Sequence, residues 1–442
     1  MLAISANALD TSEYTSTFKG ADGFVYGVVN EGFGTCEIAY PDAGGDLDGF
    51  GNLISGDLLV PEYVTDPSTG KEYMVIGIGV QAFYKCDAQY DKYWTLTLPN
   101  SILTIDQWAF AECELLQKIN FGSNLTSIGE YAFNKCYELG NLRFPDSLEE
   151  IGKYAFYGMK AMTTVVIPES VTTLGDYSFC GDKDDTSNPC SIERFVVGPD
   201  VEKLNGRVLG YNNNLKVLVL NFPVPPTNES SNLFSNTDVT ITTIYVPDES
   251  LDLYKACDDW NNNYAKWQFK ALRPLSELEV AQLTLSFPEE TYTVEVGEEF
   301  TLPTLDIVTE ANPEEASLYL VYTVTGDEGI AEVSEDGQTV TFNTSVAGSV
   351  TVTASLEENY FFAATPAEFV LTVKAPETPD QPGEEPGEEP GEDDGVDGVL
   401  ADDAPAAVYN LAGCLVGNST EGLNPGVYVV RQGNKALKVE VK

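Results

Sequence analysis

The residues best suited to chemistry in this 442-residue chain are eight cysteines and two short acidic segments. The segments PDAGGDLDG at 41–49 and GDKDD at 181–185 place carboxylates at spacings that calcium could use, but neither has the EF-hand spacing. Histidine is absent, so a nucleophile lacks the usual general base, and zinc or copper lacks its commonest ligand. Among 70 acidic residues, no aromatic-lined segment singles out a pair for glycoside hydrolysis. We therefore expect no catalytic residue, no metal site and no cofactor, and we interpret the acidic segments as solvated loops.

A repeated aromatic pattern dominates the first half of the chain and would position any functional residues there. The segments QAFYKC, WAFAEC, YAFNKC, YAFYGM and YSFCGD align on phenylalanines spaced 27 and then three times 23 residues apart: Phe83, Phe110, Phe133, Phe156 and Phe179. This period is typical of leucine-rich repeats. Between them run LTLPNSILTI, INFGSNLTSIG, LRFPDSLEEIG and VVIPESVTTLG, which predict one short strand and one irregular or helical turn per unit. No unit buries its own apolar face, so stacking must build a continuous core.

Side chains alternate across a strand, so the repeat also predicts which residues point inward. The inward positions are Leu96, Leu98, Ile119, Phe121, Leu142, Phe144, Val165 and Ile167, with the repeated phenylalanines behind them. One equivalent position holds a cysteine in three units and a methionine in the fourth: Cys86, Cys113, Cys136 and Met159. We expect these cysteines to be buried thiols rather than disulfides. Cys180 and Cys190 flank the insertion GDKDDTSNP, and they either bridge it or remain reduced.

The residues that alternate with the inward ones form the candidate binding surface, which we call the concave face. After Thr95 and Thr97, its residues are Lys118, Asn120, Asn141, Arg143, Thr164, Val166, Arg194, Val196, Val217, Val219, Thr243 and Tyr245. Three of the 23 basic residues and no acidic residue lie here, although the net charge of the chain is -47. This pattern predicts a surface that binds local carboxylates or sulfates toward one end and apolar groups toward the other. The alternative is that β-branched residues simply suit a sheet and the charges are chance.

The pattern changes after Pro274 to short alternating strands separated by glycine, proline and aspartate turns. Six such segments within 274–375, from AQLTLSF to AEFVLTVKA, are typical of a β-sandwich. Residues 376–397 form an acidic Pro/Gly tract, which predicts a solvated linker that tolerates removal of everything after Ala375. The sequence pattern of residues 398–442 predicts short strands, the last two of which form a hairpin with its turn at Gly433 and Asn434.

The repeats resemble the BspA-type leucine-rich repeats of bacterial surface proteins, whose pattern is close to I-P-x-S-V-x-x-I-G-x-x-A-F-x-x-C. The resemblance is strong over 79–220 and extends to a closing unit at 242–272, while 14–76 is similar to the strand-rich opening unit of that family. Residues 274–375 resemble a bacterial Ig-like domain through VEVGEEFTLP and AGSVTVTA, and 398–442 resemble C-terminal sorting domains of secreted Bacteroidetes proteins. The resemblance implies a secreted or cell-surface protein that adheres to host proteins, and it implies no chemistry.

The expected fold is mainly β with short helical or irregular turns: a leucine-rich-repeat solenoid, an Ig-like β-sandwich and a small C-terminal β-hairpin module. The expected parts are a signal-peptide remnant or disordered terminus at 1–13, a capping unit at 14–78, repeats with their cap at 79–273, a sandwich at 274–375, a linker at 376–397 and a sorting-like module at 398–442. Ala6-Asn7-Ala8 has the small-x-small form of an export-signal cleavage site. No apolar run approaches the roughly 18 residues of a membrane-spanning helix.

The net charge disfavours bulk attraction to nucleic acid or to an anionic membrane. We therefore expect a monomeric, non-enzymatic, adhesin-like protein that is secreted or lies at the outer cell surface. Its expected partner is a host or bacterial surface protein or a glycan, without nucleic acid or membrane insertion. The alternatives are a structural surface scaffold without a specific ligand and an accessory module of carbohydrate-active machinery.

Overall fold

The computed structural model divides the chain into two units, 1–376 and 377–442, which are considered separately. It describes residues 14–40, 56–86, 93–184, 190–202, 204, 206–226, 233–258, 260, 268–334, 336–375, 406–410, 415–417, 426–432 and 435–441. The expected export-signal stub, the acidic segment at 41–49, the linker at 376–397 and the turn at Gly433 and Asn434 lie outside these residues.

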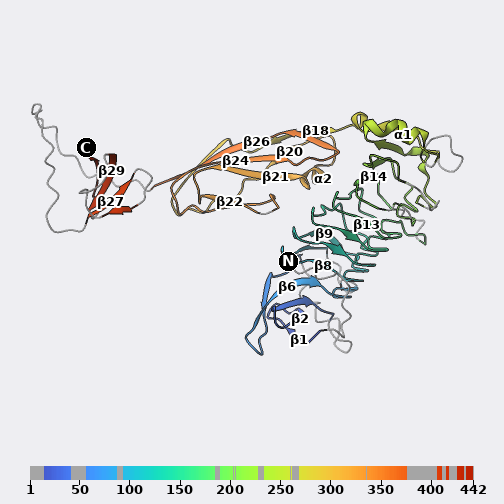
Figure 1. Cartoon of the computed structure of the whole chain (residues 1–442), viewed down its shortest axis with the longest axis horizontal. Helices are drawn as coiled ribbons and strands as arrows, with labels where there is room; N and C mark the ends of the chain where they lie inside the picture. Colours follow the sequence, from blue (N-terminus) through green and yellow to red (C-terminus); the bar gives the residue numbers. More distant parts are fainter. Residues whose placement is uncertain are drawn as a thin grey trace, which may run out of the picture. The chain divides into compact units, whose positions relative to one another are not determined.

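The repeats form a solenoid with two rows of parallel strands, whose successive rungs can be followed in Figure 1. The first row contains β6 (Glu72–Ile78), β8 (Thr104–Ile105), β10 (Ser127–Ile128), β11 (Glu150–Ile151) and β13 (Thr173–Leu174). The second row begins with β4 (Gly56–Leu59), β7 (Trp94–Thr97) and β9 (Leu116–Asn120). It continues with β12 (Thr164–Val166), β14 (Arg194–Val197), β15 (Val217–Leu220), β16 (Thr243–Val246) and β17 (Ala271–Pro274).

The two ends of the solenoid have additional elements. At the N-terminal end, four strands extend the first row: β1 (Thr17–Lys19), β2 (Val25–Asn30), β3 (Thr35–Ile38) and β5 (Tyr63–Thr65). β3 pairs with β6 in parallel, whereas the pairs β1–β2, β2–β3 and β5–β6 are antiparallel. At the other end, the short helix α1 (Leu251–Ala256) and the segment after it bring Tyr254 and Trp260 into the core, where both are fully buried. Since the last rung has no following unit to cover it, these large side chains close the apolar core.

The core of the solenoid follows the predicted alternation. Of the eight inward residues, all but Phe121 are buried, and Phe121 is partly buried and packs against the same core. The five repeated phenylalanines stack face to face through the interior, with adjacent ring centroids 4.9 or 5.1 Å apart. Each ring therefore covers the apolar face of the ring in the next rung.

The tight turns between rungs contain residues whose backbone lies in the left-handed region. Trp108, Tyr131, Tyr154 and Tyr177 have φ between 57° and 62°, which costs a residue with a side chain about 1–2 kcal/mol. Their rings form a second, partly exposed stack with centroid distances of 4.2, 4.7 and 4.5 Å, which offsets this strain. Gly152 allows the rungs to approach closely, because a Cβ there would lie 2.6 Å from the carbonyl carbon of Gly129.

The sequence predicts one strand in every repeat, but residues 141–145 of one rung do not form a strand. The side chain of Asn141 takes over part of the ladder there. Its Oδ1 accepts hydrogen bonds from the backbone N–H groups of Thr163 and Thr164, at 2.8 and 2.9 Å. Leu142 and Phe144 still point into the core, so side-chain alternation persists where the backbone ladder is interrupted.

The repeated cysteines are buried thiols, as the register predicted. The Sγ atoms of Cys86 and Cys113 lie 3.3 Å apart, and Cys136 donates to the carbonyl of Phe110. Cys180 and Cys190 are also reduced, and burial raises the pKa of each to about 12. Thiolate formation, which reaction with thiol reagents requires, is therefore suppressed at Cys180 and Cys190 in the folded chain.

We predict that Cys86, Cys113 and Cys136 react with a maleimide only after denaturation, because the stacked rungs exclude the reagent. Peptide mass spectrometry before and after treatment with guanidinium checks this. Cys257, which is only partly buried, provides the internal control and should be labelled earlier than the three repeat cysteines. A disulfide between any two of the three, or labelling at the rate of Cys257, would contradict the prediction.

A second β domain follows the solenoid within the first unit, and we call residues 281–374 the downstream domain. Its strands are β18 (Ala281–Ser286), β19 (Thr291–Glu295), β20 (Asp306–Val308), β21 (Leu320–Gly326), β22 (Ala331–Val333), β23 (Val340–Phe342), β24 (Gly348–Leu356), β25 (Phe362–Thr365) and β26 (Ala367–Lys374), with the helix α2 (Pro313–Ser317). They form sheets in the orders β20-β18-β25, β19-β26-β24-β21 and β22-β23. Phe369, Leu371 and Val352 lie at the centre of its core.

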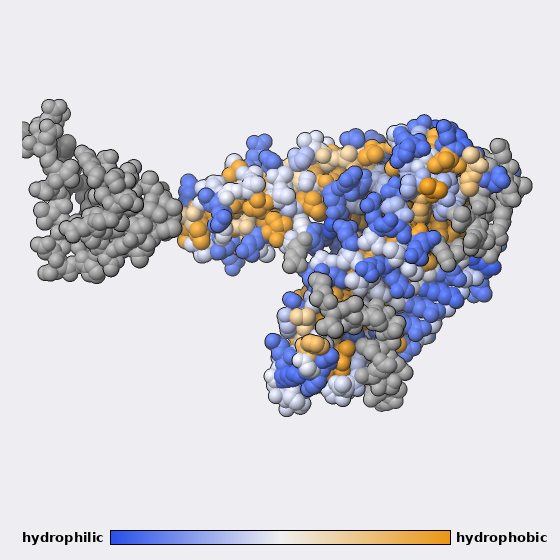
Figure 2. Space-filling model, in the orientation of Figure 1, coloured by the Kyte–Doolittle hydropathy of each residue, from blue (hydrophilic) through white to orange (hydrophobic). Residues whose placement is uncertain are grey.

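The second unit contains an antiparallel sheet in the order β28-β27-β29-β30. Its strands are β27 (Ala406–Asn410), β28 (Leu415–Gly417), β29 (Gly426–Gln432) and β30 (Lys435–Val441). Gln432 is paired with Lys435 across β29 and β30. Over the described part of the chain, no helix has the length and apolar character needed to cross a membrane. Much of the described surface in Figure 2 is hydrophilic, in keeping with the 70 acidic residues.

Candidate functional site

The concave face is where the sequence placed the candidate binding residues, and the downstream domain packs on part of it. Val196 and Val219 point away from the solenoid core and are buried against Phe361 and Phe362. Leu283 and Ala316 complete this apolar contact, while Val166, Val217 and Tyr245 pack at its edge. The apolar end of the predicted surface is thus covered by the same chain.

Arg194 lies in the middle of this contact and pairs with a carboxylate of the downstream domain. Its Nη2 donates to Oε2 of Glu315 in α2, and its Nε donates to Thr164 Oγ1 at 3.0 Å. The guanidinium carbon lies 4.7 Å from the ring centroid of Phe361, a cation–π contact. The Glu315 side chain is only 1% exposed. Burial raises the pKa of Glu315, and the Arg194 charge opposes this rise.

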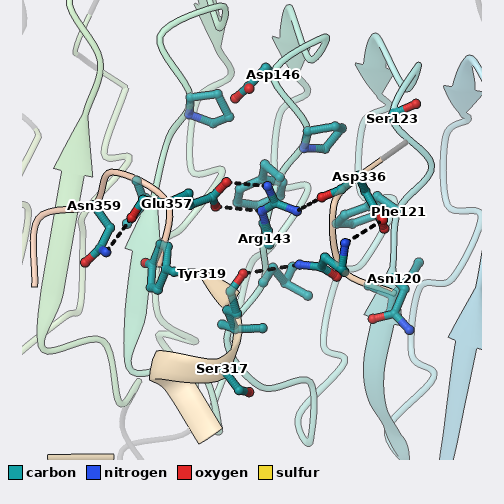
Figure 3. Close-up of a pocket in the computed structure, with 18 of the residues that line it drawn as sticks. Asn120, Phe121, Ser123, Arg143, Asp146, Ser317, Tyr319, Asp336, Glu357 and Asn359 are labelled. Carbon is teal, nitrogen blue, oxygen red and sulfur yellow. Dashed lines mark hydrogen bonds and ion pairs between the residues drawn. The ribbon is translucent and has the colours of Figure 1, made fainter. Parts of the chain in front are cut away.

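Arg143 makes a second contact with the downstream domain, at the centre of Figure 3. Its Nε and Nη2 donate to the two carboxylate oxygens of Glu357 at 2.8 and 2.5 Å, and Nη1 reaches the carbonyl of Asp336 at 3.4 Å. Such a bidentate pair has a fixed geometry. Two of the three basic residues predicted to bind an external anion are therefore neutralised within the chain.

Beside Arg143, the concave face and three segments of the downstream domain enclose a cleft of about 540 Å³, a volume within the range of ligand pockets. From the solenoid it is lined by Lys118, Ile119, Asn120, Phe121, Ser123, Leu142, Arg143, Phe144, Pro145, Asp146, Val166 and Pro168. From the downstream domain it is lined by Ser317, Leu318, Tyr319, Asp336, Gln338, Glu357, Glu358, Asn359 and Tyr360. Figure 3 shows Asp146 and Ser123 at one end of the cleft and Ser317 at the other.

The structure brings four of the twelve predicted residues together in this cleft: Lys118, Asn120, Arg143 and Val166. Lys118 is exposed and makes no hydrogen bond or ion pair with the described residues. Asn120 donates to Thr97 Oγ1 at 3.2 Å on the neighbouring strand and faces the cleft. The remaining predicted residues either hold rungs together, as Asn141 does, or lie in or beside the contact with the downstream domain.

The residues contributed by the downstream domain were missed by sequence reasoning. Tyr319, Gln338 and Glu358 lie in segments that were interpreted only as sandwich strands and turns. Burial and the nearby carboxylates of Glu315 and Glu357 raise the pKa of Tyr319, so its phenol stays protonated. No repeat or spacing in these segments signals proximity to the solenoid, and only their aromatic and acidic character could have attracted attention.

The acidic segment at 181–184 is more structured than the expected solvated loop. The Asp182 side chain is 6% exposed, pairs with Lys135 at 3.0 Å and accepts a hydrogen bond from the Tyr157 hydroxyl at 3.1 Å. Its carboxylate is thus occupied by structural contacts. Among the residues that the structure describes, no group of three or more acidic, cysteine or histidine side chains is placed to hold a metal ion.

Two buried acids also interact near the N-terminal end of the solenoid. Glu37 accepts a hydrogen bond from the Tyr14 hydroxyl at 3.2 Å, and its pKa is raised to about 7 by burial and by the charge of Asp106. Both carboxylates belong to buried residues, and neither lines the cleft. The pair therefore belongs to the interior of the solenoid rather than to the candidate site.

Comparison with known proteins agrees with the repeat architecture. The sequence model of the family described as BspA type leucine rich repeat region matches residues 72–186 in six copies. No curated protein matches the chain. The solved structure of a T. pallidum leucine rich repeat protein is similar at 21% identity and a TM-score of 0.37, over 57% of this chain and 97% of that one.

Two further solved structures are similar to part of the chain. A leucine-rich repeat protein from Bacteroides ovatus is 24% identical, with a TM-score of 0.40, over 54% of this chain and 56% of that one. A leucine rich cell surface protein from Faecalibacterium prausnitzii is 14% identical, with a TM-score of 0.25, over 60% of this chain and 96% of that one. The family model by itself supports a leucine-rich repeat region of the BspA type at residues 72–186.

Proposed function

We propose that this chain is a non-enzymatic, adhesin-like binding protein, secreted or at the outer cell surface, whose macromolecular ligand enters the cleft. One observation carries the proposal: the concave face and the downstream domain jointly enclose a cleft of about 540 Å³ that is lined by the exposed Lys118 and by Asn120. Leucine-rich repeats of this type are found in surface proteins, and their stacked rungs supply a rigid face for protein interactions.

The downstream domain supports a role in binding as well as spacing. We propose that it is an Ig-like sandwich that forms one wall of the site. Its loops around Asp336 and Glu357 reach the solenoid through Arg143, so the wall is held by a bidentate ion pair. We propose that the C-terminal sheet acts as a sorting or attachment module, and its four antiparallel strands agree with the resemblance of 398–442 to such domains.

The test fills the cleft without changing the charge of the protein. Immobilised full chain captures partners from a panel of host extracellular proteins and glycans, and the captured macromolecule is titrated against variants. Asn120→Trp should weaken binding by at least about tenfold, since losing a hot-spot contact near the centre of an interface costs about 2 kcal/mol or more. Gln117→Trp places the same side chain on β9 at a residue outside the cleft lining, and it should leave binding unchanged.

Three results would overturn this proposal. Binding by Asn120→Trp equal to that of the unmodified chain would place the site elsewhere. Turnover of a captured glycan would favour the carbohydrate-active alternative. Absence of any captured macromolecule across the panel would favour a structural surface scaffold.

A further inference from the structure

The concave face carries only basic charges in the sequence, but the cleft that forms on it has a different net charge. Arg143 is neutralised by Glu357, and Arg194 by Glu315. The remaining charged residues of the lining are one base, Lys118, and three acids, Asp146, Asp336 and Glu358. The packing of the downstream domain therefore converts a basic surface into a cleft with a net negative charge.

Two of these acids are available to a ligand. Asp146 and Glu358 belong to exposed residues, and neither side chain makes a hydrogen bond or ion pair within the described parts of the chain. They come from opposite walls, since Asp146 follows Pro145 in the solenoid and Glu358 lies in the downstream domain. A cationic group in the cleft would therefore have an unpaired carboxylate available on each wall.

The third acid of the lining, Asp336, already accepts hydrogen bonds from its own loop. Asp336 Oδ1 accepts hydrogen bonds from the Ser334 hydroxyl at 2.5 Å and from the backbone N–H of Gln338 at 3.0 Å. These bonds hold the loop in shape and keep its charge at the cleft. Asp336 therefore adds to the negative potential without being required as a direct contact.

Aromatic side chains in the same lining favour an organic cation over a bare metal ion. Phe121, Tyr319 and Tyr360 line the cleft, and aromatic rings attract lysine and arginine groups through cation–π contacts. The chain uses this combination at the neighbouring contact, where Arg194 meets both the Glu315 carboxylate and the Phe361 ring. The cleft likewise brings the unpaired acids Asp146 and Glu358 into one lining with aromatic rings.

We infer that the cleft recognises lysine or arginine side chains on a basic segment of a protein partner. This inference rests on the proposed function and specifies the chemistry of its ligand. The net charge of -47 would draw such a segment toward the protein, and the two walls would select it at short range. An anionic ligand would be repelled by the three acids of the lining and by the net charge of the chain. Lys118 is the one unneutralised base in the lining.

The experiment uses two defined probes with the full chain. The first is a fluorescein-labelled, C-terminally amidated octapeptide of alternating lysine and glycine, and the second replaces each lysine with glutamate. Fluorescence anisotropy at about 0.15 M salt limits long-range attraction. The lysine peptide should bind, and Asp146→Asn with Glu358→Gln should weaken it at least about fivefold through loss of two charge contacts.

A matched double variant separates recognition at the cleft from bulk attraction. Glu150→Gln with Asp306→Asn makes the same change in net charge at exposed residues of β11 and β20, outside the cleft lining. It should change affinity for the lysine peptide by less than about twofold. Equal weakening by both double variants, or absence of binding, would overturn the inference.

A further outcome distinguishes this inference from the function on which it rests. If the glutamate peptide binds and Lys118→Ala abolishes that binding, the cleft is a site for acidic ligands, so the proposed function stands and the basic-segment inference fails. If Asn120→Trp leaves binding of the lysine peptide intact, the peptide binds outside the cleft and the inference fails as well.

Discussion

Replacing Arg194 with alanine is expected to lower the free energy of unfolding of the first unit by about 3–5 kcal/mol, because it leaves a buried carboxylate without its charged partner. The Glu315 side chain is 1% exposed, and its Oε1 already has no hydrogen-bond partner among the described residues. Chemical denaturation of the full chain measures the loss. The sequence instead placed Arg194 on the candidate binding surface, where it was expected to meet an external ligand.

The pH dependence of this variant follows from the same carboxylate. Burial raises the pKa of Glu315 above its ordinary value, and removing Arg194 takes away the charge that opposes the rise. The folded variant then binds a proton at higher pH than the unfolded chain does. A group of this kind stabilises the folded state as pH falls, so the deficit should shrink from neutral to mildly acidic pH.

Two controls isolate the buried pair. Arg273→Ala removes an arginine from the exposed pair with Glu277, whose side chains are 52% and 50% exposed, and should cost less than about 1 kcal/mol. Arg194→Met combined with Glu315→Met should recover most of the lost stability, because it leaves no uncompensated charge. If Arg194→Ala costs no more than Arg273→Ala, the contact between solenoid and downstream domain does not hold in solution.

Phe133→Ala is expected to destabilise the solenoid by about 3–5 kcal/mol, since it removes a fully buried ring from the middle of the core. Its ring stacks on Phe110 and Phe156 at centroid distances of 5.1 Å on both sides and meets the edge of Phe121. Each rung is stabilised chiefly by its neighbours, so the cavity weakens two interfaces at once. Denaturation followed by tryptophan fluorescence provides the measurement.

Phe33→Ala is the matched control for the loss of a phenyl ring. Phe33 is 74% exposed in the turn between β2 and β3, and its removal should change stability by less than about 0.5 kcal/mol. Phe133→Leu should recover part of the loss, because it fills much of the cavity. A change below about 1 kcal/mol for Phe133→Ala would show that the rungs collapse around the missing ring.

The sequence by itself determined the rungs of the solenoid and the direction of most side chains on them. Phe133 and Cys136 were assigned to the interior from their place in a 23-residue period, and both are fully buried. This worked because stacking repeats the same local environment in each unit, so a pattern along the chain is also a pattern in space. Asn141 shows the limit of that logic, since its side chain replaces a piece of backbone ladder in a single rung.

Only the tertiary structure decided what covers the concave face and which of its basic residues remain open. Arg143 and Glu357 are 214 positions apart in the sequence, and Arg194 and Glu315 are 121 apart. Both arginines lie in the repeat array but neither carboxylate does, so no local pattern could reveal that the two arginines would be neutralised. The cleft around Lys118, and the sign of its charge, exist because two separately patterned domains bury apolar surface against each other, which depends on three-dimensional fit rather than on periodicity.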